Sequence, residues 1–500
     1  MGERLLVRYY RDSKTSSVQA IGGLSVPDLD SRCSSESSRT FVSSASPLTE
    51  AVSDGWPPQD EGRAAWVFLF GASIIEAVSW GFPACFGVFR EYYFTHPPFK
   101  GVKVLAVTGV LSDGCLQMLM PLLLLFLKRH PQFNRRMMWT GLLFCVVACI
   151  GASFSTKAWQ IIATQGAIYG MGAGFLSAPI IVLMSEWFDK RQSFAYGIMF
   201  GSSGLCGSFM PTVYSKLLHA SGQRFTLLVY GSGVLVLTTG ALLCVGHRIP
   251  LNERGTLHEA EKMHPPSSSN YDFWTKASFW LLGGSVIVQA CVLNLPAIYL
   301  PSFVTDLQYS PAQGAIALSM FNLSTASGQV GFGLFADHRS SFYSTLIMST
   351  IVSGLSSLLY WGEVKSLSAS VIFATMYGAS SGGFGILRSR FAGTVVGDSG
   401  DREQILIVLG LFTAARGAGN VAGGFIGQGL VDEDISVQWR SYGLQKWMPL
   451  ILFVTAGMLL AGALGGLQQV HQRLGARWKN RNPQWKRSWP RSIEDLKSKL

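Results

Sequence analysis

Charged residues are scarce in this chain, and their scarcity excludes an ordinary soluble protein. Asp, Glu, Lys and Arg make up 14% of the 500 residues, whereas soluble domains carry about a quarter. Hydrophobic residues make up 48%, and the mean hydropathy is +0.30. Apolar stretches of roughly 20 residues, long enough to cross a bilayer core, recur from Ala65 almost to the end of the chain. The composition therefore indicates an integral membrane protein with many spans.

Sequence patterns that carry enzyme chemistry are missing as well. None of the eight cysteines forms a Cys-x-x-Cys pair, and seven of them lie inside apolar runs, as expected of small residues in helix packing. The histidines include no His-x-x-x-His metal spacing, and no Gly-x-x-x-x-Gly-Lys-Ser/Thr phosphate loop occurs. We therefore expect no enzyme activity, no metal, no cofactor and no ATP-driven pumping.

The positive net charge does not indicate a nucleic-acid partner. The formal charge is +11, but the basic residues lie in short connections and in the C-terminal tail. Anionic lipid and the topology rules of membrane proteins account for them there. We expect the lipid bilayer, and no nucleic acid, among the partners.

Hydropathy predicts twelve transmembrane helices in two sets of six. The first set lies near 65–88, 104–127, 137–156, 159–184, 194–217 and 225–246, and the second near 279–300, 312–335, 342–362, 367–387, 405–430 and 447–467. The predicted fold is an all-α integral membrane protein with two six-helix bundles, 64–246 and 279–467. A disordered N-terminal tail (1–63), a central loop (247–278) and a basic C-terminal tail (468–500) complete the chain.

The distribution of Lys and Arg predicts the orientation in the membrane. An even number of spans places both tails and the central loop on one side. Connections on that side hold fourteen Lys and Arg residues, and those on the opposite side hold nine. Because cytosolic connections carry the excess of positive charge, both tails and the central loop should be cytosolic.

Glycines recur at helical spacing in two of the predicted spans. Gly166, Gly170 and Gly174 form a stripe in the fourth span, and Gly197 and Gly201 belong to a similar stripe in the fifth. Small residues let membrane helices approach closely. Two interpretations remain open: the stripes are packing grooves, or they are surfaces on which helices rock against one another.

Three short motifs stand out: GRAAW at 62–66, EWFDKR at 186–191 and GFGLFAD at 331–337. Together they resemble the major facilitator superfamily, specifically its monocarboxylate-transporter-like porters of fungal type. The second motif resembles that family's loop between helices four and five and ends in Asp189, Lys190 and Arg191. The third resembles the turn after helix eight and ends in Asp337. The resemblance implies a two-bundle secondary transporter with alternating access, and a gating or packing role for these four residues.

The chain departs from the best-understood animal members of that family, which move lactate-like anions with a proton. Those proteins use a lysine late in helix one, and an aspartate and an arginine four residues apart in helix eight. The corresponding residues here are Ala84, Thr325 and Gln329. The missing charges argue against proton-coupled transport of lactate.

Three ionisable residues lie near the middle of predicted spans, where a charge costs at least about 2.5 kcal/mol. They are Glu76, Asp113 and Arg416. Arg416 could bind a carboxylate or enolate of the substrate, or form a structural salt bridge with either carboxylate. Glu76 or Asp113 could take up and release a proton during transport, or be held by hydrogen bonds.

Uncharged polar residues accompany these charges. Asn322, Thr325 and Gln329 share one face of the eighth span, and Asn420 lies one turn from Arg416. Hydrogen bonding between helices is the alternative to a role in substrate binding. The full set of uncharged candidates for lining a substrate cavity is Asn322, Thr325, Gln329, Asn420, Gln289 and Asn294, of which the last two point from different faces of the seventh span.

The chain ends in Ser498, Lys499 and Leu500. This tripeptide matches a peroxisomal address, which an import receptor reads. A cytosolic C-terminus would leave it accessible, but proteins with many spans usually reach that organelle through other signals. The plasma membrane and the peroxisomal membrane both stay open as locations.

These observations predict a secondary-active transporter that moves an organic anion or a secondary metabolite, by efflux or across an organelle membrane. Arg416 would anchor the anionic group, and Glu76 or Asp113 would couple protons. An importer of short monocarboxylates is one alternative. A non-transporting membrane sensor with the same fold is the other.

Overall fold

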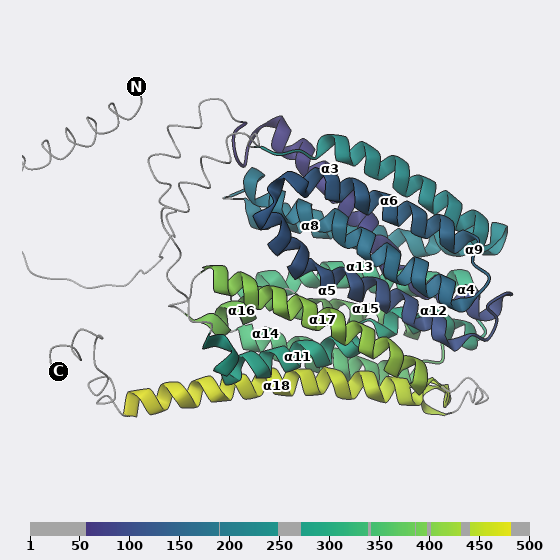
Figure 1. The fold of residues 1–500 in the computed structure, drawn as a ribbon. Coiled ribbons are helices and arrows are strands. Elements are labelled where there is room, and N and C mark those ends of the chain that lie inside the picture. Colours follow the sequence, from purple (N-terminus) through teal and green to yellow (C-terminus); the bar gives the residue numbers. More distant parts are fainter. Residues whose placement is uncertain are drawn as a thin grey trace, which may run out of the picture. The chain divides into compact units, whose positions relative to one another are not determined.

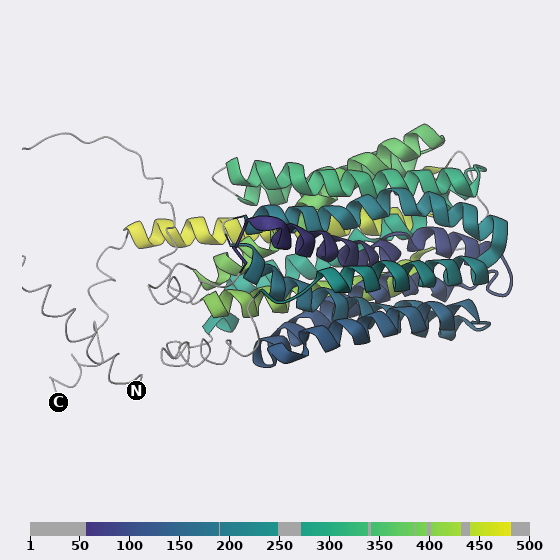
Figure 2. The same cartoon turned by 90° about the horizontal axis from the view of Figure 1, so that it is seen from above.

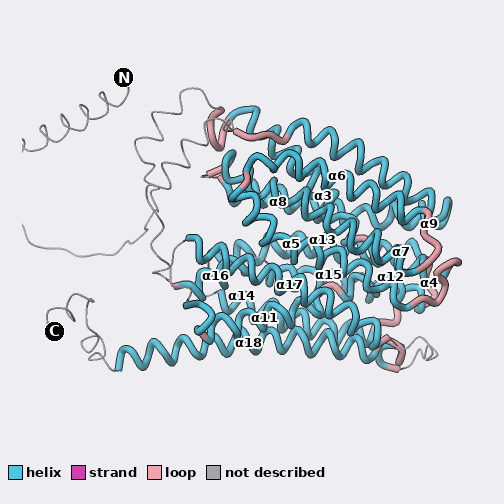
Figure 3. The backbone as a smooth tube through the Cα atoms, in the orientation of Figure 1, coloured by secondary structure: helices cyan, strands magenta, loops and turns pink. Residues whose placement is uncertain are grey.

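The structure is a computed structural model, and it describes residues 57–189, 191–248, 272–338, 342–385, 387–397, 402–431 and 441–481. The described residues belong to one compact unit. Most of the predicted N-terminal tail, Lys190, most of the central loop and the C-terminal tripeptide lie outside the described residues. All regular structure in the described ranges is helical, with loops at the two ends of the helices, which confirms the all-α fold (Figure 3).

The N-terminal half contains the first six predicted spans. Its helices are α3 (Gly62–Ala84), α4 (Phe86–Thr95), η1 (Lys103–Ala106), α5 (Val107–Arg129), η2 (Pro131–Phe133), α6 (Asn134–Ser153), α7 (Ala158–Ile161), η3 (Ile162–Ile168), α8 (Tyr169–Trp187) and α9 (Gln192–Cys244). The fifth and sixth spans are both part of α9. They meet at Gly222, whose φ of 77° and ψ of 174° break the helical geometry and turn the chain back.

The C-terminal half contains the other six spans. Its helices are η4 (Asp272–Thr275), α11 (Ala277–Leu293), α12 (Leu295–Asp306), α13 (Pro311–His338), α14 (Phe342–Leu355), η5 (Ser356–Tyr360), η6 (Trp361–Glu363), α15 (Leu367–Gly385), α16 (Arg388–Val396), α17 (Arg402–Leu430), η7 (Tyr442–Leu444) and α18 (Met448–Arg481). Ten helical stretches among the described residues are long and apolar enough to cross a membrane. That number counts α9 once and leaves out α13, so it agrees with twelve spans.

Two helices extend past their predicted ends. The last span was expected to end at 467, but α18 continues to Arg481, so the first part of the predicted C-terminal tail is helical. The tenth span was expected to end at 387, but a second segment, α16, continues it to Val396. Hydropathy ends both spans too early because Lys and Arg side chains in a terminal turn lower the average without ending the helix.

The first and seventh spans are each broken near the middle, at equivalent places in the two halves. Cys85 separates α3 from α4 two residues after Pro83, and Asn294 separates α11 from α12 two residues before Pro296. Proline removes a backbone donor and collides with the preceding turn, which explains the break before Pro296. Each break frees backbone carbonyls in the middle of the protein.

The two halves lie side by side along their helices. In Figure 1 the purple-to-teal helices of the N-terminal half occupy the upper part and the green-to-yellow helices of the C-terminal half the lower part, and the view from above in Figure 2 shows the same long helices. The halves meet along α5 and α17, along α9 and α13, and along α4 and α12. The contact of α4 with α12 lies at the end of the molecule opposite to the start of α3 and the finish of α18 (Figure 1).

Glycines make the contact of α5 with α17 close. A Cβ atom added to Gly114 would lie 2.9 Å from the carbonyl oxygen of Gly417, and one added to Gly417 would lie 2.7 Å from that of Gly114. Real Cβ atoms do not come this near to backbone atoms. The two helices therefore touch backbone to backbone, one from each half.

Candidate functional site

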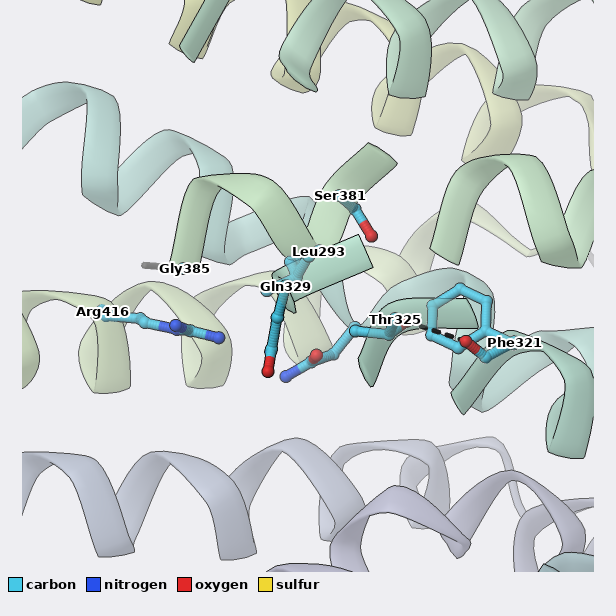
Figure 4. Close-up of a pocket in the computed structure, with 9 residues that line it drawn as sticks. Leu293, Phe321, Thr325, Gln329, Ser381, Gly385 and Arg416 are labelled. Carbon is cyan, nitrogen blue, oxygen red and sulfur yellow. Dashed lines mark hydrogen bonds between the residues drawn. The ribbon is translucent and has the colours of Figure 1, made fainter. Parts of the chain in front are cut away.

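A pocket lies in the C-terminal half, where the break between α11 and α12 faces α13, α15 and α17. Its lining combines apolar, amide, hydroxyl and cationic groups, as substrate pockets commonly do. The lining residues are Leu293, Asn294, Phe321, Thr325, Gln329, Ser381, Gly382, Gly385 and Arg416. Figure 4 shows the guanidinium of Arg416 pointing toward the side chain of Gln329.

The structure brings together four of the residues that the sequence singled out for the substrate cavity, one of which is Asn294. Thr325 and Gln329 lie one turn apart on α13, and Arg416 reaches the same pocket from α17. The hydroxyl of Thr325 donates a hydrogen bond to the carbonyl oxygen of Phe321, 2.8 Å away. Glycine at position 382 brings α15 close to α13, because a Cβ there would lie 2.6 Å from the carbonyl oxygen of Thr325.

Arg416 has no carboxylate partner of its own. In the described part of the chain, no salt bridge joins Arg416 to Glu76 or to Asp113. Its Nε atom is buried and makes no hydrogen bond. A buried donor without an acceptor costs about 1 to 3 kcal/mol. The structural salt bridge considered as an alternative is therefore not formed, although Asp113 is near enough to attract the guanidinium.

Asp113 instead accepts hydrogen bonds from three amide side chains. Gln117, one turn along α5, donates to Oδ1 over 2.7 Å. Asn294 and Asn420, both from the C-terminal half, donate to Oδ2 over 2.8 Å and 2.6 Å. Asp113 is 7% exposed and Asn420 only 1%. The carboxylate thus joins the two halves and lies beside the pocket, of which Asn294 is a lining residue.

Asn322 does not line this pocket, although the sequence predicted that it would. Its side-chain amide donates to the carbonyl oxygen of Ala84, 3.1 Å away, and to that of Gly207, 2.8 Å away. Ala84 lies at the break of the first span, so the broken helix supplies an acceptor for the other half. Asn322 is therefore a contact between the halves.

Two further candidates lie away from the pocket. Gln289 is 1% exposed, its Nε2 atom has no partner, and it is absent from the lining, whereas Asn294 on the same span lines it. Glu76 is buried within the N-terminal half, where the hydroxyl of Ser177 donates to its carboxylate over 3.0 Å. Glu76 and Arg416 are thus not brought together.

The glycine stripes differ in what they contact. Cβ atoms at Gly166 and Gly170 would collide with α5, so both glycines serve packing, and Gly174 has only ordinary contacts. Gly197 and Gly201, in contrast, have nothing within 4 Å of where a Cβ would be. Of the two interpretations left open for this stripe, close packing is not seen at these two positions in this arrangement.

The loop between the fourth and fifth spans is bound by a residue that the sequence did not single out. The side chain of Asp60 accepts hydrogen bonds from the backbone N–H groups of Asp189, at 3.1 Å, and Arg191, at 2.8 Å. The exposed side chain of Asp189 takes no part in these two bonds. For Asp337 only the helical backbone is described, at the end of α13.

Arg388 is another residue that the sequence did not single out. The predicted tenth span ended one residue before it, so it was counted among the residues of a connection. The structure instead places it at the start of α16, where its Nε donates to the carbonyl oxygen of the pocket residue Gly385 over 3.1 Å. The run of small residues before it could have indicated a helix that continues.

Within the described residues, no three His, Cys, Asp or Glu side chains are arranged to hold a metal ion. The seven cysteines that the structure describes are all free thiols. The residues that line the pocket offer recognition by charge and hydrogen bonds.

Comparisons with known proteins agree with this arrangement. A family model, the Major Facilitator Superfamily, matches residues 118–424. The MFS-type transporter pynF of Aspergillus niger is 25% identical over 456 residues, which cover 89% of this chain and 98% of that protein. The aspyridones efflux protein apdF of Emericella nidulans is 24% identical over 416 residues, with coverage of 82% and 78%.

A solved structure shows the same fold. The nucleoside transporter NupG superposes with a TM-score of 0.61 and 15% identity, over 81% of this chain and 98% of that one. At this identity the likeness concerns the fold alone. The relatives are transporters, which agrees with a protein that is not an enzyme. Because the family model covers more than half of the chain, this membrane transporter belongs to the major facilitator superfamily.

Proposed function

We propose that the protein is a secondary-active porter that exports an organic anion or an acidic secondary metabolite, with Arg416 as the anchor for the anionic group. The observation that carries the proposal is the position of Arg416 in a pocket that contains no acidic side chain. A bound anion would stabilise a cation in such a place, because a buried charge without a partner is costly. A carboxylate or enolate of the substrate could supply that negative charge.

The remaining lining residues suit an anion with an apolar body. Thr325, Gln329 and Asn294 offer hydrogen bonds to carbonyl or hydroxyl groups, and Leu293 and Phe321 offer apolar contacts. Export is favoured because one relative is named as an efflux protein for aspyridones. We further propose cytosolic termini, and a plasma-membrane or peroxisomal location.

Transport would follow from movement of one half against the other. The pocket lies against the interface between the halves, next to Asp113 and its amide partners. Of the two candidate carboxylates for coupling to protons, Asp113 is better supported than Glu76, because it binds both halves at once. Loss of its bonds to Asn294 and Asn420 would favour separation of α5 and α17.

The test is flux of labelled carboxylates and acidic polyketide-like compounds in membrane vesicles, with and without a pH gradient. Wild type is compared with Arg416→Gln and with Arg390→Gln, which removes an arginine outside the pocket lining. We expect flux that Arg416→Gln reduces at least tenfold while the protein remains folded by thermal unfolding. Unchanged flux in Arg416→Gln would contradict the proposal. Binding without flux would favour a sensor, and inward flux of short monocarboxylates would favour an importer.

A further inference from the structure

A second arginine, which is not itself a lining residue, is bonded to a residue of the pocket that Arg416 lines. Arg388 begins α16, one turn beyond the pocket residue Gly385, and its Nε donates to the carbonyl oxygen of that glycine over 3.1 Å. Nη1 of Arg416 lies 3.6 Å from the place where a Cβ of Gly385 would be. Both arginine side chains therefore approach the same glycine.

A Cβ at position 385 would make only an ordinary van der Waals contact with Nη1 of Arg416, so this guanidinium lies directly beside α15. The charges of the two arginines repel each other, and Asp113 attracts both. Two cations that repel each other at partly buried positions are costly unless an anion compensates them.

The formal charges around the pocket indicate the charge of the anion that would fit. Arg388 and Arg416 contribute two positive charges, and Asp113 contributes one negative charge. The three hydrogen bonds on Asp113 come from neutral amides, so they leave that balance unchanged. A net single positive charge remains for a ligand to compensate.

We propose that Arg388 and Arg416 together bind one monoanionic group whose charge is shared by two oxygen atoms, a carboxylate or an acidic enol. This inference rests on the proposed function, because it uses the same pocket and names the second cation and the class of substrate. Two oxygen atoms allow each guanidinium to donate to a different one. The apolar part of the ligand would contact Phe321 and Leu293.

Such a site should select ligands by their charge. A neutral ester of the same compound leaves both arginines uncompensated, so it should bind weakly. A dianion of similar size exceeds the single positive charge and adds repulsion from Asp113. The protein should therefore prefer monoanions over both neutral and doubly charged relatives of the same skeleton.

The experiment measures binding to the purified full-length protein in detergent, by the rise in the thermal unfolding temperature. The probes are aliphatic and aromatic monocarboxylates and cyclic acidic enols, each with its O-methyl derivative and a dicarboxylate analogue. The variants are Arg388→Gln, Arg388→Lys and Arg416→Gln, and Arg390→Gln serves as the control for loss of a charge from α16. Unliganded unfolding temperatures show whether each variant is folded.

We expect at least one monoanion to stabilise wild type and Arg390→Gln, with its ester and its dicarboxylate analogue weaker. Arg388→Gln should weaken that binding roughly ten- to a hundredfold, because one or two charge-assisted hydrogen bonds are lost. Arg388→Lys should restore part of it, because lysine keeps the charge but not the planar fork. A role in folding alone would lower the unliganded unfolding temperature without changing the preference for the acid over its ester.

Two results would overturn the inference in different ways. If Arg388→Gln binds monoanions as tightly as wild type while Arg416→Gln does not, Arg388 has no part in binding and the proposed function survives. If neither variant changes binding, or no monoanion binds wild type, the anion site itself is refuted, and the proposed function fails with it. Equal binding of acid and ester would contradict the selection by charge.

Discussion

Asn420 on α17 donates a hydrogen bond to the carboxylate of Asp113 on α5, over 2.6 Å and across the interface between the two halves. Asn294, from the break of the seventh span, donates to the same oxygen. The carboxylate thus holds two segments of the C-terminal half against one helix of the N-terminal half. Any movement that separates α5 from α17 must break these bonds.

Replacement of Asp113 by Asn should weaken this closed interface. The new side chain can offer one acceptor oxygen in place of two, and its NH2 group faces other amide donors. The contact between the halves should therefore lose about 1 to 3 kcal/mol of stability. Spin labels at Lys100 and Lys365, one in each half and both in loops at the α4 and α12 end, would report the separation by their distance distribution. We expect a larger population of long distances in Asp113→Asn. An unchanged distribution would mean that Asp113 does not hold the interface.

Arg90 should hold the same end of the molecule. It projects from α4, donates to the hydroxyl of Ser302 on α12, and lies over the ring of Tyr299 with 4.2 Å from Cζ to the ring centroid. A desolvated cation over an aromatic ring contributes about 2 kcal/mol. Arg90→Gln should therefore open this end, measured with the same pair of labels. Arg90→Lys keeps the charge over the ring and should change the distances less; an equal effect of both variants would argue against the cation–π contact.

The sequence predicted the helices far better than the site. Twelve spans could be located because each is a long apolar run, and hydropathy reports such runs directly. Thr325 and Gln329 were found because they recur on one face of one helix. The sequence grouped Asn322 with them, but its amide points to the other half. There the carbonyl oxygens of Ala84 in the first span and Gly207 in α9 accept its hydrogen bonds. No pattern in a single helix shows which partner its face will meet.

Charged residues near helix ends were the other difficulty. Arg388 looks like part of a loop, because a charge after an apolar run is the usual sign of a span's end. The structure instead begins a helical segment at Arg388, whose Nε bonds to the pocket residue Gly385. The fifth-span stripe left packing and rocking both open, and nothing lies within 4 Å of where a Cβ of Gly197 or Gly201 would be. Both points concern tertiary contacts, which local sequence does not encode.

Asn322→Ala tests whether the bond from α13 to the first span stabilises the protein. The variant removes both hydrogen bonds and leaves the carbonyl oxygens of Ala84 and Gly207 without this donor. We expect a loss of about 1 to 3 kcal/mol in the free energy of unfolding, measured by thermal or denaturant unfolding in detergent. Thr325→Val, which removes a hydroxyl bonded only within its own helix in the described contacts, should cost less. Equal losses would show that the contact between the halves has no special weight.

Two glycine substitutions separate close helix contacts from open helix faces. At Gly114 a methyl group would lie 2.9 Å from the backbone oxygen of Gly417 and 2.4 Å from a methyl of Val421, so Gly114→Ala should push α17 away from α5. At Gly201 nothing lies within 4 Å, and Ala is favoured over Gly in a helix by about 1 kcal/mol. We expect Gly114→Ala to lower the unfolding temperature and the flux, and Gly201→Ala to leave the unfolding temperature unchanged or higher. If Gly201→Ala nevertheless abolishes flux in a stable protein, the helix face around Gly201 must pack against another helix during transport. That result would support the interpretation that helices rock against one another at the fifth-span stripe.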